Sequence, residues 1–314
     1  MLNHDRLGRG TVALAVGGFV ALALVGGAGS GRATESRERA VSLEAYRGLG
    51  AWISIYDKRA WRMPERTVER LAAHEVHTLF LQTSNYRQSV DVVRPAAVAR
   101  FIAAAHGAGM AIVGWYLPSL TDPARDLRRA LAAATYQTAS GDTFDSLALD
   151  IEATLVRAIW RRNARATALA TRLRRALDPA YPLGAITIAP VGASPSYWPE
   201  YPFAALARSV DVLLPMEYFT YRVRGPARVR AYSAANVRVI RDEIGEPRFP
   251  MHAIGGTAPR ATPAEIRAFL RAASTCQSVG ASIWEASALT GGEWAALAPA
   301  TDLSSSSPTA GPVC

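Results

Sequence analysis

Two carboxylates stand two residues apart at the end of an apolar run. The run covers residues 144–152, and Asp150 and Glu152 close it. Side chains on a strand alternate between faces, so these carboxyls should share a face, with α-carbons roughly 6.5 Å apart. Repulsion between them favours one protonated and one charged group, as glycoside cleavage requires. The plainer interpretation is that both acids cap a following helix.

Apolar runs alternate with amphipathic segments along the chain, which is typical of strands followed by helices. Strands are expected over residues 48–56, 78–83, 110–117, 144–152, 183–190, 212–218, 250–254 and 281–285. Eight buried strands, each followed by a helix, predict a parallel sheet closed into a single (β/α)8 barrel of the α/β class. The barrel is predicted to cover residues 46–299, with a linker at 31–45 and a tail at 300–314.

Barrels of this kind place their active sites at the carboxyl ends of the strands. The other polar and aromatic residues near those ends are Asp57, Gln82, Trp115, Tyr116, Glu217, Tyr218, Trp284 and Glu285. Aromatic faces stack on sugar rings, and carboxylates and amides bind hydroxyl groups. The chain has no glycine-rich phosphate-binding fingerprint. These residues therefore predict a carbohydrate ligand.

Each candidate has a catalytic and a structural interpretation. Glu152 is expected to be the general acid and Asp150 its charged partner. Tyr218 would orient the substrate, or would be a core tyrosine bonded to the backbone. Trp284 would lie under a sugar ring, or would fill the barrel interior.

Two further acids are candidates for a second carboxylate. Glu217 and Glu285 flank the aromatic residues Tyr218 and Trp284. Alternation along the strand places Met216 and Tyr218 on the inner face, which predicts that Glu217 points outward. Asp57 and Gln82 are weaker candidates, because loop acids and amides are often solvated turn residues.

Residues on three of the expected strands match a known pattern. Asp145, Asp150 and Glu152 occupy the first Asp, the last Asp and the Glu of Asp-Gly-x-Asp-x-Asp-x-Glu. Residues 216–219 are similar to Met-x-Tyr-Asp on a sixth strand, and Trp284 lies on the eighth. In these positions the chain resembles the chitinase-like family 18 glycoside hydrolases. The resemblance implies that Glu152 donates a proton, that Trp284 lies beneath a sugar, and that Asp145 belongs to the site.

The chain departs from that family at Ser146, Ala148 and Phe219, where the pattern has Gly, Asp and Asp. In the family, Asp and Tyr side chains help the acetamido group of the substrate to act as nucleophile. The Asp-x-Glu pair also resembles the family 25 lysozyme-like muramidases, and residues 46–299 resemble secreted glycoside-hydrolase-like barrels of high-GC bacteria. Two hypotheses follow: a glycoside hydrolase acting on a polysaccharide or cell-wall glycan, or a non-catalytic carbohydrate-binding barrel.

The charge of the chain does not indicate a nucleic-acid partner. The formal net charge is +9, but the cations are arginines except for Lys58, and they are scattered through the expected helices. No basic run is interleaved with aromatic residues, so binding to DNA or RNA is disfavoured.

The first thirty residues differ in composition from the rest. Arg6 and Arg9 precede an apolar run over residues 11–27, followed by small residues, which is the order of a secretory signal over residues 1–30. An uncleaved membrane anchor through residues 11–28 is the alternative. Either interpretation predicts an extracellular or cell-surface protein, which we expect to be a monomer.

Cys276 and Cys314 are the two cysteines, and an exported chain predicts that they form a disulfide; two free thiols are the alternative. His74 and His77 lack the spacing and the third ligand of a zinc site. His252 lies inside an expected strand and is interpreted as a core histidine. We therefore expect neither a metal nor a cofactor.

Overall fold

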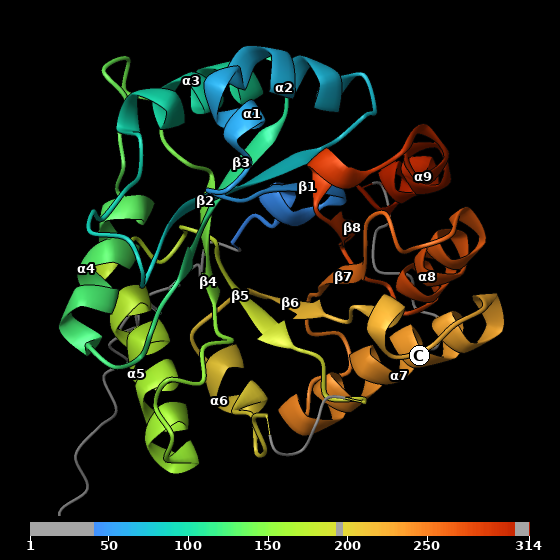
Figure 1. The fold of residues 1–314 in the computed structure, drawn as a ribbon. Coiled ribbons are helices and arrows are strands. Elements are labelled where there is room, and N and C mark those ends of the chain that lie inside the picture. Colours follow the sequence, from blue (N-terminus) through green and yellow to red (C-terminus); the bar gives the residue numbers. More distant parts are fainter. Residues whose placement is uncertain (1–40, 193–196, 305–313) are drawn as a thin grey trace, which may run out of the picture. The chain divides into compact units, whose positions relative to one another are not determined.

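The computed structural model describes residues 41–192, 197–304 and 314. Eight parallel strands form a closed barrel in the order β1 to β8, with β1 hydrogen-bonded to β8 (Figure 1). The strands are β1 Gly48–Ile53, β2 Thr78–Asn85, β3 Ala111–Leu117, β4 Ser146–Asp150, β5 Leu183–Ile188, β6 Val212–Met216, β7 His252–Thr257 and β8 Gly280–Trp284. The predicted (β/α)8 barrel is confirmed.

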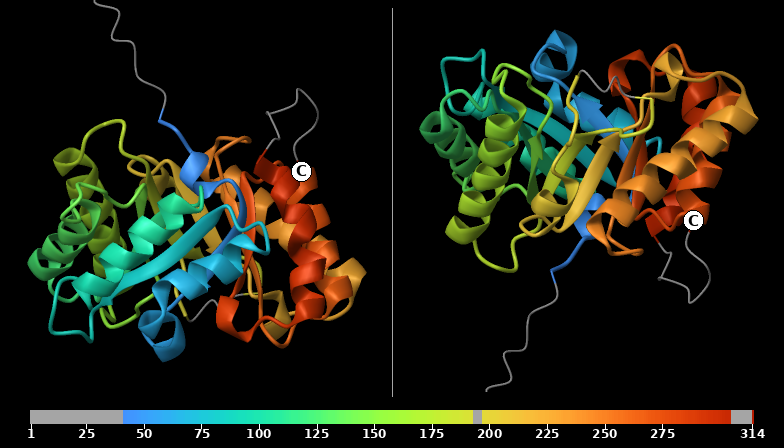
Figure 2. Two further views of the ribbon diagram at one scale, coloured as in Figure 1. Left: turned by 90° about the horizontal axis from the view of Figure 1, so that it is seen from above. Right: turned by 90° about the horizontal axis from the view of Figure 1, so that it is seen from below.

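Helices surround the strands on the outside of the barrel (Figures 1 and 2). They are α1 Lys58–Arg62, α2 Pro64–Ala72, α3 Pro95–Gly107, α4 Pro123–Ala134, α5 Ile159–Ala176, α6 Phe203–Ala207, α7 Pro226–Ile244, α8 Pro263–Thr275 and α9 Gly291–Leu297. Several begin at proline, whose fixed φ angle and missing N–H suit the first helical turn.

The predicted signal or anchor segment, residues 1–30, lies outside the described residues. Within the described ranges, none of the helices has both the length and the apolar character needed to cross a membrane. The described end of the predicted linker includes Ala45, which is buried. A 3-10 helix, Ala298–Ser304, opens the predicted tail.

Aromatic rings fill the interior of the barrel. Trp52 on β1 stacks on Phe80 on β2 with ring centroids 4.2 Å apart, and both are fully buried. Tyr46 precedes β1, and its hydroxyl bonds to Ser146 Oγ at 2.6 Å. A Cβ at Gly184 on β5 would lie 2.6 Å from that hydroxyl, so the interior requires glycine there.

A chain of hydrogen bonds runs along the interior and fixes Trp52. His252 Nδ1 donates to the Tyr46 carbonyl at 2.8 Å, which leaves Nε2 to accept from Ser282 Oγ at 3.0 Å. Trp52 Nε1 donates to the same Ser282 oxygen at 2.8 Å. Burial lowers the pKa of His252 to about 4, so its ring is neutral and has a partner on each nitrogen. The prediction of a core histidine is confirmed.

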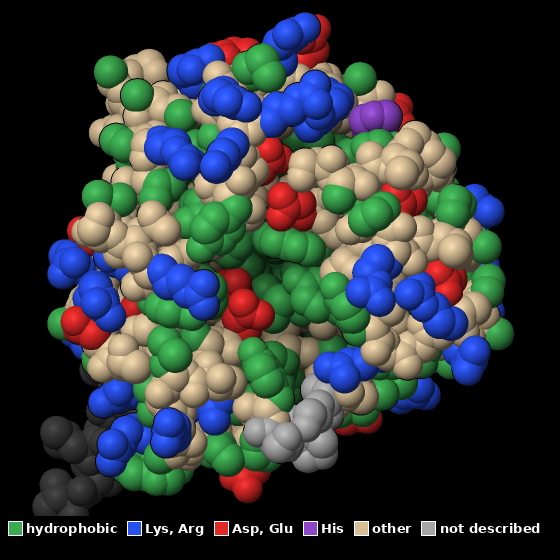
Figure 3. Space-filling view, in the orientation of Figure 1, with side chains coloured by type: hydrophobic (Ala, Val, Ile, Leu, Met, Phe, Trp, Pro, Cys, Tyr) green, Lys and Arg blue, Asp and Glu red, His purple; other side chains and the backbone are tan. Residues whose placement is uncertain are grey.

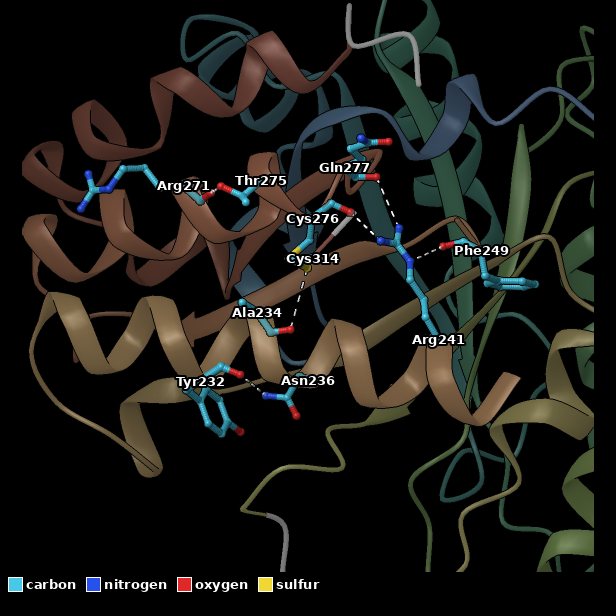
Figure 4. The surroundings of a disulfide bond; sticks show 10 residues. All are labelled: Tyr232, Ala234, Asn236, Arg241, Phe249, Arg271, Thr275, Cys276, Gln277 and Cys314. Carbon is cyan, nitrogen blue, oxygen red and sulfur yellow. Dashed lines mark hydrogen bonds between the residues drawn. A yellow bond between two sulfur atoms is a disulfide. The ribbon is translucent and has the colours of Figure 1, made fainter. Parts of the chain in front are cut away.

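The predicted disulfide between Cys276 and Cys314 is present, so the alternative of two free thiols is wrong (Figure 4). Cys276 follows α8 and is fully buried. Its carbonyl accepts a hydrogen bond from Arg241 on α7 at 2.6 Å. The bridge therefore fastens the last residue of the chain to the layer formed by α7 and α8.

We expect Cys314→Ser to lower the free energy of unfolding by about 3–4 kcal/mol, because it opens a loop with a sequence separation of 38 residues. Urea denaturation without reductant measures the change. The control is wild-type protein treated with dithiothreitol, which should match the variant. Equal unfolding midpoints for oxidised wild type and the variant would contradict this account.

Candidate active site

The turn after β4 presents both acids of the Asp-x-Glu pair. β4 ends at Asp150, so Glu152 lies two residues beyond the strand rather than within it. Two tyrosines hold the backbone of this turn. Tyr201 donates to the Ile151 carbonyl at 2.8 Å, and Tyr197 donates to the Glu152 carbonyl at 2.9 Å.

Both acids line one hollow at the carboxyl end of the barrel, which we call the central cavity. Its volume is about 440 Å³. Figure 3 shows a hollow with hydrophobic side chains inside it and acidic side chains at its wall. The lining residues are Trp52, Ser54, Tyr56, Gln82, Asn85, Tyr86, Arg87, Trp115, Leu117, Asp150, Glu152, Ile186, Met216, Tyr218, Ile254, Trp284 and Glu285.

Three tryptophans from three strands meet in the central cavity. The ring centroids of Trp52, Trp115 and Trp284 lie 5.9 to 6.1 Å from one another. Trp115 Nε1 is buried and has no hydrogen-bond partner among the described residues. The cluster offers broad apolar faces to a ligand in the central cavity.

Burial raises the pKa values of both acids. Asp150 is only 6% exposed, and its Oδ1 has no partner among the described residues. Burial raises its pKa well above the ordinary range, and the charge of Glu152 raises it further. Burial also raises the pKa of Glu152, which is less deeply buried. This differs from the expectation that Asp150 is the charged member, because the deeper carboxyl has the stronger preference for its proton.

Tyr218 and Glu285 complete the polar wall. Burial, and then the charges of Glu152 and Asp150, raise the pKa of Tyr218 well above its usual value, so its hydroxyl stays protonated. Burial also raises the pKa of Glu285, whose carboxylate accepts a hydrogen bond from Ser287 at 3.1 Å. Both residues line the central cavity, as does Gln82, whose side-chain oxygen accepts from the Ile55 N–H at 2.9 Å.

Two sequence-based candidates lie elsewhere. Asp145 precedes β4 and is therefore at the opposite end of the strand from Asp150, roughly 17 Å away. Its carboxylate accepts from the Ile112 N–H at 2.7 Å. Tyr116 is fully buried, and its hydroxyl donates to Asp126 on α4 at 2.7 Å. The placement of Asp145 and Tyr116 in the site was wrong.

Two other acids are also outside the central cavity. Asp57 caps α1 by accepting a hydrogen bond from the Ala60 N–H at 3.0 Å, which is the turn role given as its alternative. Glu217, which is expected to point outward from the barrel interior, is not among the residues that line the central cavity; it is 1% exposed and lines a neighbouring hollow. The chain beyond β6 lies beneath α7, where Tyr232 donates to the Glu217 carbonyl at 2.7 Å.

The sequence pattern of β1 could have predicted part of the cavity wall. Trp52, Ser54 and Tyr56 alternate along and beyond β1, and all three line the cavity. Strict alternation of this kind marks one face of a strand. Asn85 could not be found in this way, because a bulge shifts the register between β2 and β3 after Gln82.

No cluster of His, Cys, Asp and Glu suited to a metal ion occurs in the described part of the chain. His74 instead stacks on Trp294 with ring centroids 4.4 Å apart.

Glu217→Gln should flatten the dependence of stability on pH. Burial raises the pKa of Glu217 from 4.5 to about 8, and the nearby Ser233 offsets only part of this. The folded state therefore binds the proton more tightly than the unfolded state, and wild-type stability should fall as the pH rises from 4.5 through 8. The loss is on the order of 5 kcal/mol and is absent in the variant.

Urea denaturation at several pH values measures this difference. The control is Glu69→Gln on the exposed face of α2, which should follow the wild type. Parallel stability profiles for wild type and Glu217→Gln would show that Glu217 does not titrate differently on folding.

No protein-family model and no curated protein matches this chain. Its fold is similar to that of an endo-β-1,4-mannanase from Thermotoga petrophila, with 12% identity, a TM-score of 0.62, and 82% of this chain and 77% of the other covered. The C-terminal domain of a putative chitinase from Desulfitobacterium hafniense has 12% identity and a TM-score of 0.59, with 82% and 99% covered. A spore cortex-lytic enzyme of Bacillus cereus has 10% identity and a TM-score of 0.58, with 82% and 74% covered. At these identities the likeness is one of fold: the chain has the (β/α)8 barrel found in these proteins.

Proposed function

We propose that this chain is an exported glycoside hydrolase that acts on a polysaccharide or cell-wall glycan. The observation that carries the proposal is the pair Asp150 and Glu152, two acids with raised pKa values in one cavity lined by tryptophans. Glycoside cleavage needs a carboxyl group that still holds a proton near neutral pH, together with faces that fit sugar rings. The similarity of fold to a mannanase and a chitinase agrees with this chemistry.

Glu152 is the proton donor in this proposal. It lies on the turn after β4 and is more exposed than Asp150, so a glycosidic oxygen in the central cavity can reach it. Its raised pKa keeps the proton available. Asp150 stays neutral beside it, so no second negative charge opposes the carboxylate that forms when Glu152 gives up its proton.

Glu285 is the second carboxylate in this proposal. It follows β8, four strands from β4 in the ring of eight, so its side chain reaches the cavity from the opposite side. The hydrogen bond from Ser287 favours its charged form, and that negative charge would stabilise the positive charge that develops on the sugar. Tyr218, which stays protonated, would donate a hydrogen bond to the substrate.

A non-catalytic carbohydrate-binding barrel is the second candidate, and two positions favour it. Ala148 and Phe219 stand where the family 18 pattern has acids, and both are fully buried. Phe219 packs against Phe269 with ring centroids 5.9 Å apart. Both residues belong to hydrophobic clusters, so apolar packing replaces the supporting acids of that pattern.

Export to the cell surface or beyond rests on the signal-like composition of residues 1–30 and on the disulfide, because disulfides persist in oxidising compartments.

Glu152→Gln should reduce glycan hydrolysis by about 10²–10⁴-fold, because the amide cannot donate an acidic proton. Release of reducing ends measures the loss, and unchanged circular dichroism checks the fold. Glu69→Gln is the control and should keep full activity. Full activity of Glu152→Gln would remove the assignment. Glycan binding by both forms without reducing ends from either would favour the binding barrel.

The rate of glycan hydrolysis should also fall as the pH rises. Because the pKa of Glu152 is raised, the acid form is present below that pKa and is lost as the pH rises through it. A profile of kcat/KM against pH should therefore show an alkaline limb above the ordinary range of glutamates, near 4.3. A rate that increases steadily to pH 9 would contradict the role of Glu152 as an acid.

A further inference from the structure

A second cavity lies directly beside the central cavity. Its volume is about 420 Å³, and the two share Glu152, Met216 and Tyr218 as lining residues. Glu152 thus stands at the boundary between two hollows. A glycan whose scissile bond lies at Glu152 would extend into both.

A third, smaller hollow continues the second cavity over the segment between β6 and α7. Its volume is about 250 Å³, and it shares Tyr221 and Arg222 with the second cavity. Arg224 and Arg228 also line it, so we call it the arginine hollow. All three arginines are exposed to solvent.

The positive charge of the arginine hollow is largely uncompensated. Among the described residues, no carboxylate lies within 4.0 Å of the guanidinium of Arg222 or Arg228, and Arg224 has only Glu265, at 3.8 Å. Glu265 is a single carboxylate, held by hydrogen bonds from the N–H groups of Gly225 and Thr262 at 2.8 and 3.0 Å, so it offsets at most one of the three positive charges. Glu217 in the second cavity is buried and holds its proton to about pH 8, so it adds little negative charge.

Contacts to the backbone hold these side chains in place. Arg228 donates to the Arg224 carbonyl at 2.8 Å, and Arg224 donates to the Arg260 carbonyl at 2.8 Å. The Arg260 guanidinium lies over the Tyr221 ring, 4.7 Å from its centroid. A guanidinium has five N–H donors, so most of those on Arg224 and Arg228 remain free for an anion.

We propose that the arginine hollow binds a negatively charged group on the glycan, so that the substrate is an anionic polysaccharide. This inference rests on the proposed function. Carboxylates, sulfates and phosphates all present the oxygen pair that an arginine fork binds in bidentate fashion. The charged sugar would lie on the β6–α7 side of Glu152, beyond the second cavity, while a neighbouring sugar occupies the central cavity.

The test measures binding by the full chain carrying Glu152→Gln, which slows turnover. Calorimetry compares three sets of oligosaccharides of equal length: neutral β-1,4-linked, uronic-acid-containing, and sulfated or phosphorylated. We expect at least one anionic set to bind more tightly than the neutral set at low salt. Adding Arg224→Gln and Arg228→Gln, which of the three hollows line only the arginine hollow, should weaken its binding about fivefold per arginine and leave neutral binding unchanged.

Arg238→Gln is the matched control. It removes the same charge from an exposed position on α7, roughly 15 Å along the helix from Arg228. Arg238→Gln should leave the tighter binding of the anionic oligosaccharides unchanged. Equal affinity for neutral and anionic sets, or an equal effect of Arg238→Gln, would overturn this inference while leaving the proposed function in place. If no oligosaccharide of any set binds, the proposed function fails, and this inference fails with it.

Discussion

Removing two neighbouring carboxyl groups from water is the constraint on which the rest of this site depends. A buried carboxylate without partners is costly, so burial favours the protonated form. Asp150 and Glu152 are in this situation because β4 delivers them into the barrel mouth, and because two tyrosines hold the turn that carries them. The fold therefore favours protonated carboxyl groups in a cavity that a sugar can reach.

The packing of the barrel interior determines where the central cavity lies. Tyr46, Phe80 and Trp52 fill the interior, and the hydrogen bonds through His252 fix the Trp52 indole. The central cavity forms beyond Trp52, at the carboxyl ends of the strands. The apolar interior also accounts for Ala148, since an acid there would be surrounded by hydrophobic side chains.

Much of this could be predicted from the sequence. The alternation of apolar runs with helical segments was enough to predict the barrel. The i, i+2 spacing was enough to predict that Asp150 and Glu152 face the same hollow. The prediction that Asp145 belongs to the site was wrong. Asp145 matches the first position of the family 18 motif, but it precedes β4 and therefore lies at the end of the barrel opposite to the central cavity. Asn85 was missed because a bulge changes the register of β2 against β3 without a clear sequence signal.

The most direct test of this account is the titration of Asp150 and Glu152, followed by ¹³C NMR of labelled carboxyl groups and assigned with Asp150→Asn and Glu152→Gln. The account predicts that both groups titrate above the values near 4 that are usual for exposed acids, with Asp150 well above them and holding its proton to the higher pH. Titration of both groups near 4 would contradict it, because no buried proton would then be available for cleavage.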